Sequence, residues 1–126
     1  MEKEFVTYEQ ALALKELEFD EPCIAFYTHQ GQFIMMRQEE EDKISTWKNS
    51  YVPLGRQYAA PTYQQAFRFF REKYNLSGLP THQSYEIWNL VTNECFIEVY
   101  PLNSFRESEL ACLNKLIEIV GKAKQG

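Results

Sequence analysis

Two stretches of the chain repeat apolar residues at helical spacing directly after a residue that can cap a helix. The first is predicted from Thr7 to about Leu17, because Thr7 and Gln10 have the T-x-x-Q spacing that satisfies the first backbone N–H groups. The second begins at Thr62, with Gln65 at the same spacing. Its apolar side chains share one helical stripe: Tyr63, Ala66, Phe67, Phe70 and Tyr74.

A third helix is predicted from Ser104 to about Val120. Ser104 and Glu107 form another capping pair. The buried side is then supplied by aliphatic residues at helical spacing: Leu110, Leu113, Leu116, Ile117 and Val120. Gly121 follows as the residue expected to end this helix, because glycine readily adopts the left-handed conformation found there.

Runs of strand-forming residues come in two pairs, and each pair encloses a short polar turn. Residues 23–28 and 32–37 flank His29-Gln30-Gly31, which predicts a first β-hairpin. Residues 84–91 and 95–100 predict a second hairpin. The segment 38–60 between the first hairpin and the second helix has no clear period, so we expect a long loop.

These elements predict an α+β fold in the order α-β-β-α-β-β-α. We expect the two antiparallel hairpins to form one sheet that three helices pack against, within a single domain over residues 1–126. The connection through the second helix leaves a parallel pairing between the hairpins open, so the firm expectation is pairing within each hairpin.

A short internal echo suggests a repeat. The sequence TYEQA at residues 7–11 recurs as TYQQA at residues 62–66, and each copy precedes a hairpin. One reading is an αββ repeat over 7–37 and 62–100, followed by the C-terminal helix 104–120. The other is that two helices met the same capping requirement independently.

Three segments resemble an uncharacterised family of small proteins from bacterial and bacteriophage genomes. They are YEQALALKELEFDEPC (8–23), APTYQQAFRFFREKYNL (60–76) and SELACLNKLIEIV (108–120), which are distributed along most of the chain, between residues 8 and 120. The resemblance implies a bacterial or bacteriophage origin. It implies no activity, ligand or catalytic residue, because none is assigned in that family.

Charge and composition narrow the classes of partner. The net charge of −5 and the pI near 5.1 disfavour a polyanion such as nucleic acid. The N-terminal segment is charged, and no apolar stretch approaches the ~20 residues that span a bilayer, so we predict a cytoplasmic protein without membrane contact. Three cysteines, none in a CxxC pair, predict reduced thiols rather than a disulfide framework.

No catalytic, cofactor-binding or metal-binding residue can be assigned from the motifs. His29 and His82 lie in Thr-His-Gln tripeptides, but neither has a second ligand at zinc-site spacing. The acidic run 39–42 lacks the alternation and the glycine of a calcium loop. The apolar flanks of Cys23, Cys95 and Cys112 predict burial rather than nucleophilic thiols, and no glycine-rich phosphate loop is present.

The remaining signals concern surfaces. Aromatic residues make up 15% of the chain, more than a core of this size needs, and both faces of the second hairpin carry apolar residues. Phe69 lies off the stripe of its helix, so we expect its ring at the surface. The candidate partner-binding residues are Trp47, Tyr51, Tyr58 and Phe69.

We therefore predict a non-catalytic protein-interaction domain that self-associates as a homodimer and can also engage another protein. Two alternatives belong to different classes. One is a small enzyme whose pocket is assembled from distant residues. The other is a single-strand nucleic-acid binder that stacks bases on Tyr and Trp. A flat apolar patch favours the first prediction, a deep cavity the enzyme, and a basic stripe beside exposed rings the nucleic-acid binder.

Overall fold

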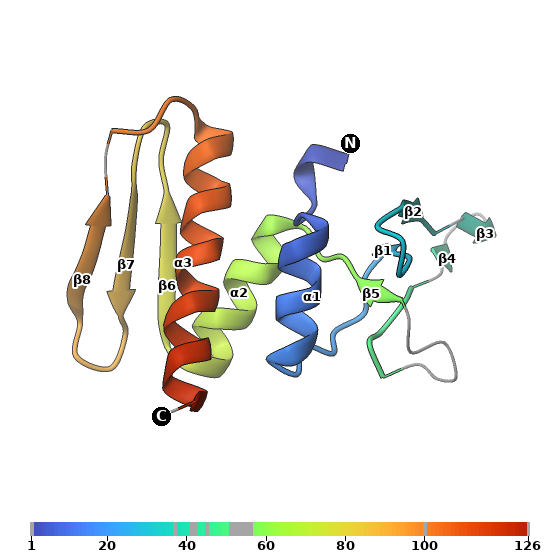
Figure 1. The fold of residues 1–126 in the computed structure, drawn as a ribbon, viewed down its shortest axis with the longest axis horizontal. Helices are drawn as coiled ribbons and strands as arrows, with labels where there is room; N and C mark the ends of the chain where they lie inside the picture. Colours follow the sequence, from blue (N-terminus) through green and yellow to red (C-terminus); the bar gives the residue numbers. More distant parts are fainter. Residues whose placement is uncertain are drawn as a thin grey trace. The chain divides into compact units, whose positions relative to one another are not determined.

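The structure, a computed structural model, divides into two compact units, Met1–Thr62 and Tyr63–Gly126 (Figure 1). The backbone is described for residues 2–36, 38–40, 43–44, 46–50, 57–99 and 101–125, and the side chains for the same residues except 38–40, 43–44, 96–99 and 125.

The first unit combines one helix with short strands. A 3-10 turn at Glu2–Glu4 precedes helix α1 (Tyr8–Glu16), and the strands are β1 (Ala25–Tyr27), β2 (Phe33–Met35), β3 (Gln38–Glu40), β4 (Lys43–Ile44) and β5 (Tyr58–Ala59). The predicted capping box of α1 is confirmed. The Thr7 hydroxyl accepts from the Gln10 backbone N–H at 3.2 Å, and the Gln10 side chain accepts from the Thr7 N–H at 3.0 Å.

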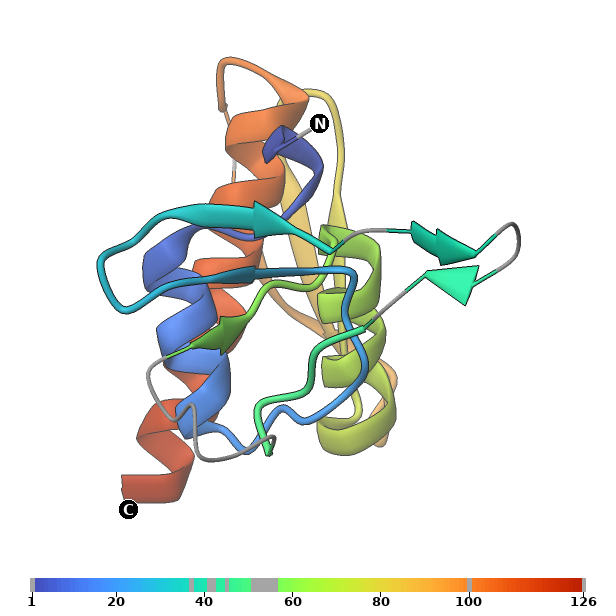
Figure 2. The ribbon, with the colours of Figure 1, turned by 90° about the vertical axis from the view of Figure 1, so that its right-hand side faces the viewer.

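The first predicted hairpin is confirmed. β1 and β2 pair antiparallel from Ala25↔Met35 to Tyr27↔Phe33, and Gly31 in the turn has a φ of 86°, which suits glycine. β5 adds to the other side of β1, so the strand order is β2-β1-β5 (Figure 2).

The segment 38–60 contains regular structure, so the expectation of one long loop is wrong. β3 and β4 form a separate two-stranded ribbon, Trp47 makes a β-bridge to Cys23, and β5 completes the first sheet. Asn49 links three parts of this unit. Its side chain donates to the Phe19 carbonyl at 2.9 Å and accepts from the Ala59 N–H at 2.8 Å. These elements have only two or three residues each, too few for a period to show.

The second unit places a three-stranded sheet against two helices. Its elements are α2 (Tyr63–Tyr74), β6 (Leu76–Pro80), β7 (Tyr85–Asn89), β8 (Glu94–Val99) and α3 (Phe105–Gln125). All pairing is antiparallel in the order β6-β7-β8. The β7–β8 hairpin confirms the second predicted hairpin. β6 was not predicted, because Gly78 and Pro80 indicate a loop, yet an edge strand accepts proline.

Gly78 brings the sheet into close contact with both helices. A Cβ at this position would lie 2.8 Å from Leu116 Cδ1, 2.9 Å from Cys112 Sγ and 3.2 Å from Phe67 Cδ1. Ile87, the register partner of Gly78 on β7, is fully buried. The face of the sheet that carries Gly78 is therefore the core face, and α2 and α3 both lie on it (Figure 1).

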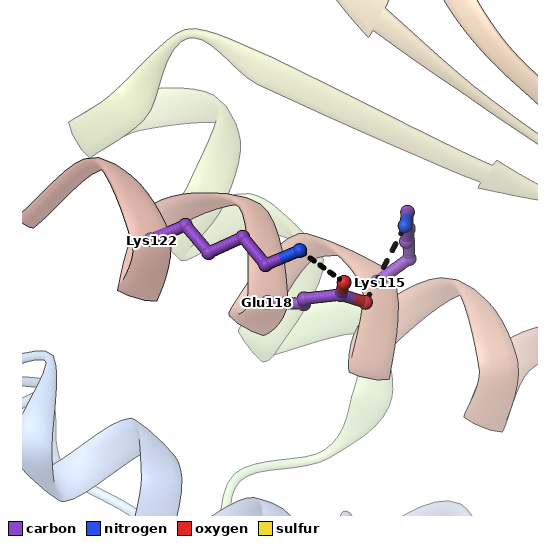
Figure 3. Close-up of polar contacts among 3 residues, drawn as sticks. All are labelled: Lys115, Glu118 and Lys122. Carbon is purple, nitrogen blue, oxygen red and sulfur yellow. Dashed lines mark hydrogen bonds and ion pairs between the residues drawn. The ribbon is translucent and has the colours of Figure 1, made fainter. Parts of the chain in front are cut away.

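Helix α3 is longer than expected. Its start is confirmed, since the Ser104 hydroxyl accepts from the Glu107 N–H at 3.2 Å. Gly121 does not end the helix, which continues to Gln125. Lys122 donates to Glu118 at 2.9 Å across one turn, and Lys115 donates to the same carboxylate at 3.4 Å (Figure 3). These bonds, with that from Lys122 the stronger cause, lower the pKa of Glu118. The helix-forming residues after Gly121 thus outweigh the unfavourable helix propensity of this glycine.

The α+β class is confirmed, but the expected single sheet is wrong. The described residues form three helices and two separate three-stranded antiparallel sheets, and no parallel pairing occurs among them. The strand orders also differ, because the first strand is central in one unit and the second strand in the other. This difference gives the repeat over 7–37 and 62–100 no support, and the repeat stays a prediction, as does the single domain.

Gly78→Ala is expected to lower the free energy of unfolding by about 1 to 3 kcal/mol, because the added methyl overpacks the contact between β6 and α3. Gly121→Ala is the matched control, since a Cβ there meets nothing within 4 Å. It should instead stabilise the protein by up to about 1 kcal/mol through helix propensity. Urea melts of both variants test the contrast, and equal effects would contradict the assigned packing.

Candidate interaction surface

Phe69 is only 5% exposed, so its expected position at the surface is wrong. Its ring packs edge to face with Phe70 and Tyr74 at 5.4 and 5.7 Å, and the Lys73 ammonium lies 5.5 Å from its centroid. The apolar stripe predicted from the sequence covers too small a part of the helix surface. The buried side of α2 also includes Phe69.

The other predicted residues do not form a common site with Phe69. Trp47 is half-buried, and its ring packs against Phe26 at 5.4 Å. Tyr58 is half-buried in β5. Both lie in the first unit, whereas Phe69 lies in the second. Tyr51 falls outside the described residues.

Aromatic rings of the first unit mainly contact one another. A continuous series of rings with centroids 5.3 to 6.0 Å apart runs through Phe5, Phe33, Tyr27, Tyr8 and Tyr58. Two hydroxyls are bonded within the chain, Tyr27 to the Val6 carbonyl at 2.7 Å and Tyr8 to the His29 carbonyl at 3.0 Å. At the end of the series the Lys15 ammonium lies 4.9 Å from the Tyr58 centroid. Much of the aromatic excess therefore stabilises this unit.

The second unit leaves one face of its sheet without a helix. Paired residues of a sheet share a face, and Gly78 and Ile87 define the core face. Residues that alternate with them lie on the opposite side, which we call the outer face. Its described side chains are Ser77 and Leu79 of β6, Glu86 and Trp88 of β7, and Cys95 of β8.

The outer face exposes apolar surface at Leu79 and Trp88, whereas Ser77 of β6 is only 8% exposed. Leu79 is 44% exposed, and Trp88, Cys95 and Glu86 are half-buried. At the β7–β8 turn Val91 is 76% exposed. In Figure 1 α2 and α3 both lie on the other side of the sheet, so neither of these helices covers the outer face.

Sequence reasoning found part of this surface. It placed Trp88 on one face of the second hairpin, but it did not predict which of the two faces the helices cover. It missed Leu79, because β6 was predicted to be a loop. The signal for Leu79 was weak: its neighbours Gly78 and Pro80 both favour turns. Of the other apolar residues expected here, the Phe96 side chain and Tyr100 lie outside the description.

The thiols and histidines assemble no site within the described part of the chain. Cys23, Cys95 and Cys112 form no disulfide, and Cys112 is fully buried. Burial raises the pKa of Cys112 to about 12, partly offset by a hydrogen bond with the Leu79 backbone. His29 and His82 are exposed. No three His, Cys, Asp or Glu side chains among the described residues are grouped to hold a metal ion, and no described helix could cross a membrane.

No protein-family model, curated protein or solved structure matches this chain. The expected membership of a bacterial and bacteriophage family therefore stays a prediction.

The unfolding free energy is expected to fall as the pH rises from 9 toward 12. The pKa of Cys112 is raised from 9.0 to about 12 in the folded state, so the unfolded chain loses this proton first and gains relative stability in that window. Burial also raises the pKa of Tyr85, which acts in the same direction.

Cys112→Ala should make this pH dependence shallower, whatever the variant does to the stability at pH 8. Urea melts at several pH values between 8 and 11 measure the slope. An unchanged slope would contradict the burial of the thiol.

Proposed function

We propose that this chain is a non-catalytic protein-interaction domain that self-associates through the outer face of the β6–β7–β8 sheet. The observation that carries the proposal is the exposure of Leu79 beside Trp88 on a sheet face that no helix of its unit covers. Apolar side chains gathered on one open face gain free energy when a partner removes them from water.

The charge distribution supports a second copy as the partner. Residues 1–62 contain six of the 13 basic and eleven of the 18 acidic residues, a net charge of −5, whereas residues 63–126 contain seven of each. Two second units can therefore approach without net repulsion, because each has a net charge of zero. An acidic first unit would instead repel its copy.

The size of the outer face predicts a weak dimer. Three strands of five or six residues span roughly 15 by 20 Å, or about 300 Å², which is well below the ~800 Å² per partner of standard stable interfaces. We therefore expect monomer and dimer to exchange over an accessible concentration range rather than a permanent assembly.

Two alternatives have less support. A single-strand nucleic-acid binder needs basic side chains beside its exposed rings, yet no described side chain on the face of Trp88 is basic. An enzyme with a thiol nucleophile needs a thiolate at neutral pH, and burial raises the pKa of Cys112 to about 12.

Light scattering after size exclusion tests self-association across about a hundredfold range of protein concentration. The mass should rise from 14.9 kDa toward twice this value as the concentration increases. A constant mass near 14.9 kDa would overturn the proposal.

A matched pair of variants locates the contact. Leu79→Lys places a charge on the outer face and should weaken the dimer by about tenfold or more, or about 1.4 kcal/mol. Phe105→Lys changes a residue of similar exposure, 46% against 44%, at the start of α3. The control should keep the wild-type dissociation constant, and both should keep the wild-type circular dichroism spectrum. A dimer that Leu79→Lys does not weaken would remove the outer face from the proposal.

A further inference from the structure

The turn between β7 and β8 holds two exposed aliphatic side chains in a fixed arrangement. Leu90 is 46% exposed and Val91 76%. The Asn89 side chain accepts from the N–H groups of Val91 and Thr92 at 2.9 and 3.2 Å. The Leu90 N–H donates to the Asn75 carbonyl at 2.9 Å. A turn that is already ordered loses little conformational entropy on binding, so Leu90 and Val91, which we call the apolar tip, are prepared for a contact.

The two helices of the second unit both end where the apolar tip lies. Asn75, which binds the turn through Leu90, directly follows the last residue of α2. Helix α3 begins at the opposite end of the sheet, where the Leu102 N–H donates to the Gln83 carbonyl at 2.7 Å. It then runs back along the strands, so its C-terminus lies at the end of the sheet that carries the turn (Figure 1). We call this the turn end and the opposite one the far end.

The turn end is positively charged. Four exposed basic residues belong to the last turns of the two helices: Arg71, Lys73, Lys122 and Lys124. One turn earlier on α3, Glu118 accepts from both Lys115 and Lys122, so this trio keeps one positive charge (Figure 3). Glu72 and Glu94 are the other acidic residues of this end. Five basic and three acidic residues therefore give the turn end a net charge of +2.

The far end is acidic. It carries Arg106 and four glutamates, a net charge of −3: Glu86, Glu98, Glu107 and Glu109. Strands of five or six residues are roughly 17 to 20 Å long, which is about twice the Debye length of ~8 Å in physiological salt. The far end therefore does not cancel the attraction between the turn end and an anionic surface.

An anionic lipid bilayer matches both features of the turn end. Aliphatic side chains gain free energy when they enter the boundary between headgroups and acyl chains, and lysine and arginine are attracted to anionic headgroups. Basic residues near helix C-termini also complement the helix dipole, but the dipole does not explain the aliphatic side chains exposed beside them. A single-stranded nucleic acid would need rings that stack on its bases, and the apolar tip has none.

We infer that the turn end docks peripherally on an anionic bilayer, with the apolar tip among the lipid headgroups and the far end directed away from the membrane. The inference does not rest on the proposed self-association, because it does not use the outer face. It replaces the sequence-based expectation of no membrane contact, since a peripheral contact needs no spanning segment. The net charge of −5 of the whole chain opposes the contact, so binding should be weak and should require a high fraction of anionic lipid.

Vesicle flotation of the full chain tests the docking, at protein concentrations where light scattering finds the monomer. The protein should partition into vesicles made of equal amounts of phosphatidylcholine and phosphatidylglycerol, and not into phosphatidylcholine alone. Salt at about 0.5 M should release it, because screening weakens the attraction to the headgroups. Equal partition into both kinds of vesicle would overturn the inference. No partition into either would also overturn it, and an acidic protein would then be the partner that fits the turn end.

A matched pair of variants tests the apolar tip. Leu90→Asp should lower the partition coefficient by about tenfold or more, because it removes an inserted aliphatic group and adds repulsion from the headgroups. Phe105→Asp is the control, since Phe105 is also 46% exposed but lies at the far end. It should keep the wild-type partition, and both variants should keep the wild-type circular dichroism spectrum. Equal partition of the two variants would show that the tip does not contact the bilayer and would overturn the inference.

A second pair tests the charge of the turn end. Arg71→Gln should lower the partition coefficient by about fivefold, as expected for one basic residue near an anionic surface. Arg106→Gln removes the same charge at the far end and should change it little. Equal losses in the two variants would indicate an attraction without a preferred end and would overturn the inferred docking.

Discussion

The close packing of α3 against the backbone of β6 at Gly78 is the contact on which the second unit depends. Only a residue without a Cβ lets Leu116 and Cys112 reach the strand at this distance. This contact covers one face of the sheet with helices, and Ile87 on that face is completely buried. Because α2 and α3 both pack on this face, the described part of the unit has no further helix for the other face. The open outer face is thus a consequence of how the core is built.

The two units differ in how they use aromatic residues. In the first unit five rings form a continuous series, and two of their hydroxyls bond to backbone carbonyls of the same unit. In the second unit the α2 rings are buried, but Trp88 stays half-exposed on the outer face. The acidic excess lies in the first unit, while the second has equal numbers of acidic and basic residues. The exposed apolar side chains of the outer face therefore belong to the unit that repels a copy of itself least.

Sequence reasoning was most successful where a local rule decides the structure. Thr7 and Ser104 cap helices through their own hydroxyls, and Gly31 permits a tight turn, so these features could be predicted. Tertiary packing decided one feature that was missed, since β6 forms despite Gly78 where two helices approach the strand closely. The other is local: α3 continues past Gly121 through helix-forming residues, with Lys122 paired to Glu118 one turn earlier.

The candidate surface was half predictable for the same reason. Alternation within β7 placed Trp88 on a defined face, but only the pairing of β6 shows which face the helices cover. Phe69 illustrates the opposite error, since helical phase predicted exposure and packing buried it. Periodicity gives the direction of a side chain, and its burial depends on the neighbours that the fold brings to it.

The central claim, that the outer face is where two copies meet, can be tested with the two tryptophans of the chain, one in each unit. Fluorine NMR of protein labelled with 5-fluorotryptophan reports both side chains at once, and Trp88→Phe assigns the two signals. On dilution through the dimer equilibrium the account predicts that the Trp88 signal shifts while that of Trp47 stays in place. A shift of Trp47 alone, or a Trp88 signal that does not respond while the mass halves, would contradict it.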